Sequence, residues 1–303
     1  MATAQRAEDE IAELNVISVV VCFNPDVKRV SELCKELLAS GSDVVLVDNT
    51  ESSDLGQVAS PGCELIATGE NNGIAYAQNI GIRRAAGSGA DAIALFDQDS
   101  KIGSGFLQAL IAPLRKGEPR VVSPVLLDEA RGVELPATRL RRFGLPMDVY
   151  SMDKAERSAV DIVIASGSVA TKEVFDLVGL MDEQLFIDHV DTEWCLRCRA
   201  KGIPIEVVPS AIMKHSIGSG ALEIGATTVL LHDPTRCYYQ VRNSLLLFRM
   251  AHIPFLFALR ETAAILWNRV LLLFHVEDRS SYVAALGDGI LDGVRGVGGK
   301  RPQ

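Results

Sequence analysis

The sequence is poor in three features that would each define a class of protein: cysteine, positive charge and long hydrophobic runs. Its 6 cysteines are spread irregularly over 303 residues, whereas a secreted domain built on disulfides carries a dense set of them. Its 39 acidic side chains outnumber the 30 basic ones, and the formal net charge of −9 argues against a general nucleic-acid binder. We therefore expect reduced thiols and no nucleic-acid partner.

Apolar segments of membrane-spanning length are absent as well. No stretch reaches the roughly 18 consecutive apolar residues that a transmembrane helix needs. The nearest approach is 245–276, which charged residues and a proline interrupt. The N-terminal residues are polar and acidic, unlike the basic and then apolar start of a signal peptide. We expect a cytoplasmic protein whose membrane contact, where it has one, is peripheral and on the inner face of the cytoplasmic membrane.

What the chain does contain is enough apolar material for a large core, since 48% of its residues are hydrophobic. Short β-branched or apolar runs at 17–23, 44–47 and 92–96 read as buried strands, and helical patterns at 27–39 and 74–86 separate them. Near-continuous apolar strands that alternate with helices predict an α/β fold: a Rossmann-like, mostly parallel sheet with helices on both faces.

We divide the chain into three parts on this basis. Residues 1–16 form a polar N-terminal segment, 17–235 the α/β domain, and 236–303 a C-terminal extension of amphipathic helices. Within the domain, the charged and irregular stretch 128–160 predicts a loop or small excursion. The glycine-rich residues 287–299 predict a frayed tail.

Polar residues follow the predicted strands directly, at Asn24, Asp48 and the pair Asp97 and Asp99. In open α/β sheets, ligands bind beyond the carboxyl ends of the strands. The spacing Asp97-Gln98-Asp99 lets two carboxylates hold Mg²⁺ or Mn²⁺ and leaves positions for phosphate oxygens. Two alternatives are a turn that binds nothing and the nucleophilic aspartate of haloacid-dehalogenase-like phosphotransferases, which place this motif near the chain start.

Two further segments fit a nucleotide ligand. The carboxylate of Asp48 can accept the imide N–H of a uracil or thymine ring, or it can cap a turn. Residues 71–81, NNGIAYAQNIG, put amides and a glycine at a predicted helix start, where backbone N–H groups attract a diphosphate; plain capping is the alternative.

A second acidic segment, 186–197, carries Asp188, Asp191 and Glu193 beside a predicted helix start. With Asp191 as the N-cap, Glu193 and Arg197 stand four residues apart and can pair on one face. A carboxylate at such a position can act as general base toward a sugar hydroxyl, although capping and a surface ion pair would explain the same residues. Cys195 and Cys198 lack a second pair of zinc ligands, so we expect free thiols.

Taken in order, these segments resemble glycosyltransferase family 2, which has the GT-A fold. The resemblance covers residues 17 to about 243. The wording of 96–100 (FDQDS), 186–197 (FIDHVDTEWCLR), 215–218 (HSIG) and 236–243 (RCYYQVRN) is similar to the bacterial rhamnosyltransferase branch. Two positions depart from the family pattern: Val190 stands where a glutamate is frequent, and Gln78 where an arginine often precedes the asparagine that matches Asn79.

The resemblance implies an inverting transfer of L-rhamnose from dTDP-L-rhamnose to a polyprenyl-diphosphate-linked or saccharide acceptor, in the assembly of an O-antigen-like surface polysaccharide. It implies Asp191 as the catalytic base. The implied metal ligands for Mg²⁺ or Mn²⁺ are Asp99, Asp97 and His215. The implied donor-binding residues are Cys22, Phe23, Asn24, Asp48, Asn72, Gly73, Asn79, Asp97 and Arg197. On the acceptor side they are Ser166, Gly167, Asp188 and Trp194.

Alternatives remain at the level of function and of partners. The chain could transfer another sugar from a UDP or dTDP donor, or bind a nucleotide sugar without catalysis. Between positions 236 and 279 six arginines outnumber three acids and are interleaved with aromatic and aliphatic residues. This composition favours a helix that lies on anionic lipid, while packing on the catalytic domain or on a second copy of the chain is the alternative.

Overall fold

The computed structural model describes residues 14–129, 131–215, 221–224 and 227–301, and its centre is one mixed β-sheet. The strands lie in the order β3-β2-β1-β4-β10-β5-β11-β9, and β6 pairs with β5. Their bounds are β1 (Val16–Cys22), β2 (Asp43–Asp48), β3 (Cys63–Ala67), β4 (Ala92–Asp97), β5 (Val121–Asp128), β6 (Glu134–Leu135), β9 (Ser158–Val160), β10 (Val169–Thr171) and β11 (Ile205–His215). Strands β3, β2, β1 and β4 run parallel, whereas β10 is antiparallel to both of its neighbours.

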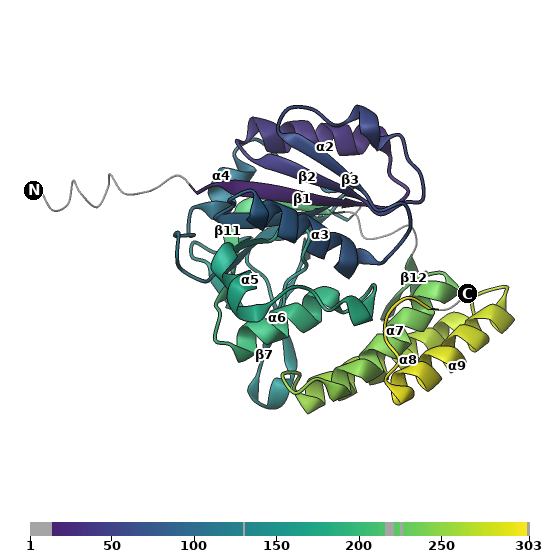
Figure 1. Ribbon diagram of the computed structural model, residues 1–303. Coiled ribbons are helices and arrows are strands. Elements are labelled where there is room, and N and C mark those ends of the chain that lie inside the picture. Colours follow the sequence, from purple (N-terminus) through teal and green to yellow (C-terminus); the bar gives the residue numbers. More distant parts are fainter. Residues whose placement is uncertain (1–13, 130, 216–220, 225–226, 302–303) are drawn as a thin grey trace, which may run out of the picture.

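Helices cover both faces of this sheet, as predicted (Figure 1). They are α2 (Val27–Ala39), α3 (Ile74–Gly87), α4 (Phe106–Ile111), α5 (Lys172–Val178) and α6 (Val190–Ala200). Successive side chains of a strand point to opposite faces. Val19 of β1 therefore packs in the core under α3, α5 and α6, while its neighbour Val20 packs in the core under α2 and α4. The α/β fold class is confirmed.

The irregular stretch 128–160 forms short strands in place of a featureless loop. The hairpin of β7 (Ala137–Leu140) and β8 (Pro146–Val149) projects from the body of the protein (Figure 1). A second small pair, β12 (Ala221–Ile224) and β13 (Thr227–Leu230), precedes the C-terminal helices. All six cysteines are free and buried, in agreement with the expectation of reduced thiols.

Three helices follow: α7 (Pro234–Leu246), α8 (Phe255–Leu273) and α9 (Arg279–Arg295). The expectation of a frayed glycine-rich tail is wrong, because α9 continues through Gly289 and Gly293 and packs along α7. A Cβ atom at Gly289 would lie 2.8 Å from the carbonyl oxygen of Tyr238, and one at Gly293 would lie 2.7 Å from the Cβ of Leu245. The glycines let the two helix backbones approach closely, and this packing offsets their low helix propensity.

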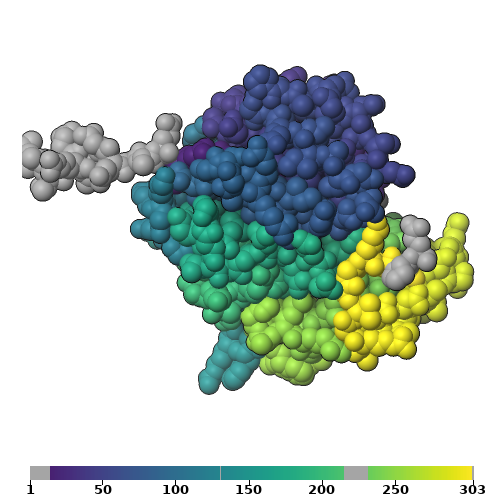
Figure 2. All heavy atoms as spheres, in the orientation of Figure 1, coloured from purple at the N-terminus to yellow at the C-terminus, as the bar shows by residue number. Residues whose placement is uncertain are grey.

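The end of the chain returns to the N-terminal half. Figure 2 shows the C-terminal segment reaching up to the surface of the parallel strands and their helices. The ammonium of Lys300 lies 2.9 Å from a carboxylate oxygen of Glu70, and the backbone N–H of Arg301 donates to the hydroxyl of Tyr239 over 2.8 Å. The C-terminal extension, described as far as residue 301, is therefore in direct contact with the α/β domain.

Helix α8 turns an apolar face to solvent. Phe255 is 67% exposed and Trp267 61%, and Leu259, Val270 and Phe274 are exposed on the same side. Of the six arginines in the lipid argument, Arg242 and Arg269 are buried and Arg236 turns inward to pair with Asp188, whereas Arg249, Arg260 and Arg279 are exposed. Among the described residues, no helix combines the length and the apolar composition needed to span a bilayer.

Candidate active site

The carboxyl ends of β1, β2 and β4 bring three predicted residues side by side. In the parallel register Cys22 lies opposite Asp48, and Val21 lies opposite Asp97. Burial, with the nearby charges of Asp48 and Asp97, raises the pKa of the Cys22 thiol, so this side chain is a neutral member of the core beneath the strand ends. The two aspartates therefore flank Cys22 at one edge of the sheet, where α/β proteins bind their ligands.

Gln98, the middle residue of the Asp-x-Asp motif, ties this edge together. Its carboxamide accepts the N–H of Phe23 over 2.8 Å and donates to the carbonyl of Phe23 over 3.0 Å. This reciprocal pair continues the β1–β4 pairing beyond the strand ends and leaves the Phe23 ring 47% exposed. We did not predict a role for Gln98, although its place between two aspartates at a strand end is a readable signal.

The turn after β2 accounts for the contacts of Asp48 and Asn24. Asp48 is buried and accepts hydrogen bonds from the N–H of Thr50 over 3.1 Å and from the hydroxyl of Ser53. The Thr50 hydroxyl in turn accepts the N–H of Asn24 over 2.9 Å. Asp48 thus closes the turn that borders the site, and its contact with a nucleotide base stays a prediction.

Asp191, which is far from Asp97 and Asp99 in the sequence, lies close enough to the end of β4 for its charge to act on Asp97. Burial first, and then the negative charges of Asp191 and Asp99, raise the pKa of Asp97 to about 7. The segment before β10 holds both ends of this group: Ser166 Oγ accepts the N–H of Asp97 over 3.1 Å, and the N–H of Ala165 donates to Asp191 over 3.1 Å. One short segment therefore positions the acidic pair and the predicted base.

Asp191 lies in the first turn of α6 and not at its N-cap, which is His189. Its side chain lines a pocket of about 120 Å³ between β5, β6 and the segment 162–164. Burial raises the pKa of Asp191, and the hydrogen bond from Ala165 opposes that rise. A carboxylate made more basic by its surroundings, at the wall of a pocket, is suited to accept a proton from a hydroxyl group.

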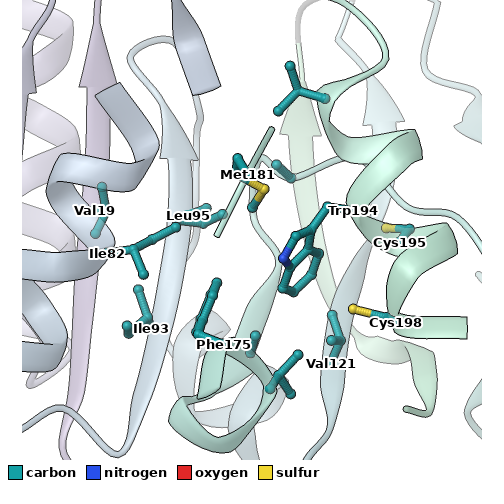
Figure 3. Close-up of a cluster of buried hydrophobic side chains, with 14 of the residues drawn as sticks. Val19, Ile82, Ile93, Leu95, Val121, Phe175, Met181, Trp194, Cys195 and Cys198 are labelled. Atoms are coloured by element: carbon teal, nitrogen blue, oxygen red, sulfur yellow. The ribbon is translucent and has the colours of Figure 1, made fainter. Parts of the chain in front are cut away.

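The predicted acceptor-side residues differ in their contacts. Ser166 is buried and also hydrogen-bonds Ser100 over 2.9 Å, and Gly167 takes a φ of +81° where a side chain would meet Met213. The indole of Trp194 is only 4% exposed, stacks on Phe175 and donates to the carbonyl of Gly179 (Figure 3). Trp194 is a core residue, so its predicted contact with the acceptor is wrong.

Asp188 holds an arginine that we had not assigned to the site. Arg236, at the start of α7, makes a forked contact with the Asp188 carboxylate, with N–O distances of 3.1 to 3.3 Å. Its positive charge reaches Asp97, where it opposes the rise in pKa. His189 is a second unassigned neighbour: burial lowers its pKa, while Glu261, Asp188 and Asp191 oppose that shift. The similarity of 236–243 to the rhamnosyltransferase branch is the sequence feature that could have pointed to Arg236.

The expected diphosphate site at the start of α3 is occupied by the protein itself. The N–H of Asn72 donates to Asn49 and that of Ile74 to the carbonyl of Phe186. Gly73 takes a φ of +89°, and a Cβ there would lie 2.6 Å from the Phe186 ring. These amides are satisfied internally, so the helix start serves as a seat for the loop that carries Phe186.

Two other predicted donor-binding residues, Asn79 and Arg197, also make structural contacts. Asn79 is buried, and its amide exchanges hydrogen bonds with the backbone of Met181 over 2.9 and 3.0 Å. Arg197 pairs with Glu193 over 2.8 Å, as predicted, and donates to the carbonyls of Val178 and Leu180. Their side chains anchor the 178–183 segment, and nothing in these contacts brings them to Asp97.

A metal site is only partly formed by the chain. Across the described ranges, no three histidine, cysteine, aspartate or glutamate side chains are grouped as metal ligands. The His215 side chain lies outside the described residues, so its predicted role stays a prediction. Asp97 and Asp99 nevertheless fit Mg²⁺ or Mn²⁺, because they are oxygen ligands whose mutual repulsion a cation would relieve. Such ions commonly bind through one or two carboxylates and complete their shell with water and phosphate.

The fold and the site together define a class, the GT-A glycosyltransferases: an α/β sheet with an acidic pair after a central strand and a further carboxylate at the start of a later helix. Residues 18–177 match the family model described as glycosyl transferase family 2, and the chain belongs to this family. The protein is therefore a glycosyltransferase.

Individual relatives agree with this assignment. The chain is 36% identical to the dTDP-rhamnosyl transferase RfbF of Shigella flexneri, over 94% of this chain and 97% of the relative. It is 24% identical to the low-salt glycan biosynthesis hexosyltransferase Agl10 of Haloferax volcanii, over 98% and 96%. The expected similarity to the rhamnosyltransferase branch is confirmed.

Solved structures show the same fold at low sequence identity. S. aureus TarS 1–349 in complex with UDP-GlcNAc matches with a TM-score of 0.57 at 15% identity, over 93% of this chain and 82% of that one. GalNAc-T7 with UDP, GalNAc and Mn²⁺ matches with a TM-score of 0.56 at 15% identity, over 69% of this chain and 45% of that one.

Proposed function

We propose that this glycosyltransferase transfers L-rhamnose from dTDP-L-rhamnose, with inversion, to a lipid-linked or saccharide acceptor in the assembly of a surface polysaccharide. The observation that carries the proposal is that Ala165 and Ser166 hold Asp191 and Asp97 together at the end of β4, next to Asp99. The choice of sugar rests on the 36% identity to a dTDP-rhamnosyl transferase.

The transfer is a single displacement. As the acceptor hydroxyl attacks the anomeric carbon, its proton passes to Asp191, the new C–O bond forms, and the bond from the sugar to the diphosphate breaks. The nucleoside diphosphate leaves with the electron pair, so no covalent glycosyl–enzyme intermediate is needed. Burial of Asp191 supports this role, since it raises the pKa of the carboxyl toward that of an effective base.

Asp99 and Asp97 would hold Mg²⁺ or Mn²⁺, and a bound cation would neutralise charge on the departing diphosphate. Arg236 is a second source of positive charge on this side, because it lies close enough to Asp97 to lower the pKa of that group. Phe23 and Asp48, at the ends of β1 and β2, would contact the base, and the exposed ring of Phe23 is suited to stack on it.

A panel of nucleotide sugars with Mn²⁺ tests the donor. Tight donor binding raises the midpoint of thermal unfolding by mass action, so the panel ranks dTDP-rhamnose against other dTDP and UDP sugars. We expect dTDP-rhamnose to give the largest rise and to be converted to a rhamnosylated product. A larger rise with a UDP sugar would identify that sugar nucleotide as the donor in place of dTDP-rhamnose. Tight binding without any transfer or hydrolysis would indicate a nucleotide-sugar-binding protein without catalytic activity.

We also propose that the exposed face of α8 contacts the cytoplasmic face of the membrane, where a polyprenyl-diphosphate-linked acceptor would be found. The support is the exposure of four large apolar residues on one side of the helix: Phe255, Leu259, Trp267 and Val270. Arg242 and Arg269 are buried, so of the arginines from α7 through α8 only Arg249 and Arg260 are exposed to meet lipid charge, and we expect apolar insertion to contribute more than charge. Pairing of two chains through the same face is the competing outcome.

A further inference from the structure

The loop that leads into α6 holds an unusual concentration of left-handed backbone. Phe186, Asp188 and His189 have φ values of 61°, 64° and 61°, and none of them is a glycine. Such conformations are disfavoured for residues with a Cβ atom and persist only where the surrounding structure enforces them. The loop places Asp188 and His189 directly before Asp191, so whatever enforces its shape also sets the position of the proposed base.

Asn243 of α7 is the main contact that enforces it. Its side-chain amide donates to the carbonyls of Leu185, Ile187 and Asp188 at 2.8, 2.7 and 3.0 Å. Asn243 is fully buried, and so a lost partner could not be replaced by bulk water. One side chain thus binds three carbonyls of the loop, with its two N–H groups shared among them.

Arg242 fixes Asn243 and grips the same loop. Its Nε donates to the Asn243 carboxamide oxygen over 2.9 Å, which orients the amide group, and another of its nitrogens donates to the carbonyls of Gln184 and Leu185. A third contact reaches the carbonyl of Gly299, beyond the end of α9. The guanidinium lies over the Tyr239 ring, and that ring stacks on Phe186 with centroids 4.7 Å apart.

We propose that Asn243, oriented by Arg242, is a positioning residue for catalysis: it clamps loop 184–189 so that α6 starts where Asp191 meets the N–H of Ala165. Both side chains are fully buried, and their hydrogen bonds go to the loop, to each other and to Gly299, not to Asp97, Asp99 or Asp191. The clamp acts through the loop, and a displacement of about 1 Å at the reacting groups is enough to cost on the order of 10²-fold in rate. This inference rests on the proposed transferase function.

The test compares Asn243→Ser with Val241→Ala in the full-length protein. Asn243→Ser removes the amide donors, whereas Val241→Ala removes buried methyl groups on the same helix, at the contact with Gly289, and leaves the loop untouched. We expect Asn243→Ser to lower kcat at least about tenfold, to change the Kd for dTDP less than threefold, and to speed hydrogen exchange of the 184–190 amides. Val241→Ala should leave kcat and that exchange within about twofold of wild type.

Equal losses of kcat in the two variants would overturn the proposal, as would faster exchange of the loop in Asn243→Ser with unchanged kcat. If Asn243→Ser does not fold, Tyr239→Leu removes the ring that stacks on Phe186. This variant should lose less kcat and should also show faster hydrogen exchange in 184–190. Unchanged exchange in Tyr239→Leu would contradict the proposal. A wild-type protein that transfers no sugar would refute the proposed function. The exchange experiment would then still decide whether Asn243 holds the loop.

Discussion

The two halves of the molecule contribute to the site in different ways. In the N-terminal half, the groups that can do chemistry follow their strands directly, so Asp48 and Asp97 reach the same edge because β2, β1 and β4 are parallel neighbours. In the C-terminal half, α7 supplies contacts to a loop more than 50 residues earlier in the chain, through Arg242 and Asn243. Asp191 lies between these halves.

The N-terminal half supplies the strand-end carboxylates of the site, and the C-terminal half helps to set the position of Asp191. A parallel sheet edge selects where carboxylates gather, and this can be read from short segments. The orientation of Asp191 depends on the Ala165 N–H from one side and on the clamped loop from the other. Through Arg242 and Asn243, α7 is thus part of the machinery that shapes the site.

The largest effect is expected from Asp191→Asn, which tests the chemical side of the comparison. The amide cannot accept the acceptor proton, so turnover should fall about 10²- to 10⁴-fold, while the Kd for the nucleotide stays within a few-fold of wild type. Steady-state kinetics with titration calorimetry measures both. Asp176→Asn, an exposed residue on α5, is the control and should behave as wild type. Turnover within a few-fold of wild type in Asp191→Asn would assign the base elsewhere.

Gly293→Val tests the geometric side. The new side chain would meet Leu245 and the carbonyl of Arg242, at 2.7 and 3.0 Å from its Cβ, and would push α9 away from α7. Overpacking of this kind costs about 1–3 kcal/mol, and the β-branched residue in place of glycine partly offsets that by its helix propensity. We expect a lower midpoint in urea unfolding. Because Arg242 of α7 donates to the carbonyl of Gly299, beyond the end of α9, we also expect a lower kcat at temperatures where the protein is still folded.

The control for this prediction is Gly287→Ala on the exposed side of α9, where nothing lies within 4 Å of an added Cβ. It should be neutral or slightly stabilising. If Gly293→Val left kcat unchanged while lowering stability, α7–α9 packing would be separable from the site, and the contrast between the halves would weaken.

The N-terminal half could be predicted from the sequence better than the C-terminal half. The parallel strands, the helices on both faces and the position of Asp48 and Asp97 at the strand ends could be predicted, because periodicity and strand-end chemistry are local signals. The expectation that Asp191 joins them came from the family resemblance. The structural roles of Trp194, Asn79 and Arg197 could not be predicted. A family motif marks these residues as important, but it does not say whether they contact the substrate or the protein core. The packing of α9 was also missed: Gly289 and Gly293 read locally as breakers, and only the close approach of α7 gives them a role.

Asp97→Asn should change how the metal-free protein responds to pH. The ordinary pKa of an aspartate is about 3.9, and that of Asp97 in the fold is about 7. Between these values the folded protein keeps a proton that the unfolded chain has released, so the stability of the wild type falls as the pH rises from about 4 to 7. The neutral amide lacks this dependence, and the variant should be more stable than wild type above pH 7, by about 1–2 kcal/mol after screening by solvent.

Thermal unfolding in a chelator, from pH 4 to 8, measures this difference, which should vanish toward pH 4. Addition of Mn²⁺ should raise the midpoint of the wild type more than that of Asp97→Asn, because the cation compensates the crowded carboxylates. A wild type and variant with parallel pH profiles would show that Asp97 is not held at an elevated pKa, and the electrostatic link between the halves through Asp191 would lose its support.

The smallest effect on the fold is expected from the double variant Phe255→Ser/Trp267→Ser, on the exposed face of α8. Surface substitutions of this kind change stability by about 0.5 kcal/mol or less, so nucleotide binding and the unfolding midpoint should stay near wild type. Binding to lipid vesicles should weaken at least about tenfold, because each buried aromatic side chain contributes about 1.5–3 kcal/mol. Leu177→Ser, which alters an exposed apolar residue on α5, is the matched control.

Vesicles with and without anionic lipid sharpen the test, since three of the six arginines between 236 and 279 turn inward and we expect the apolar face to matter more than lipid charge. Unchanged vesicle binding in the double variant would remove α8 from the membrane contact. Loss of a concentration-dependent dimer in its place would identify the face as a contact between two copies of the chain. In either case the C-terminal half would keep its inward role, because Arg242 and Asn243 face the catalytic loop from α7 while Phe255 and Trp267 face solvent from α8.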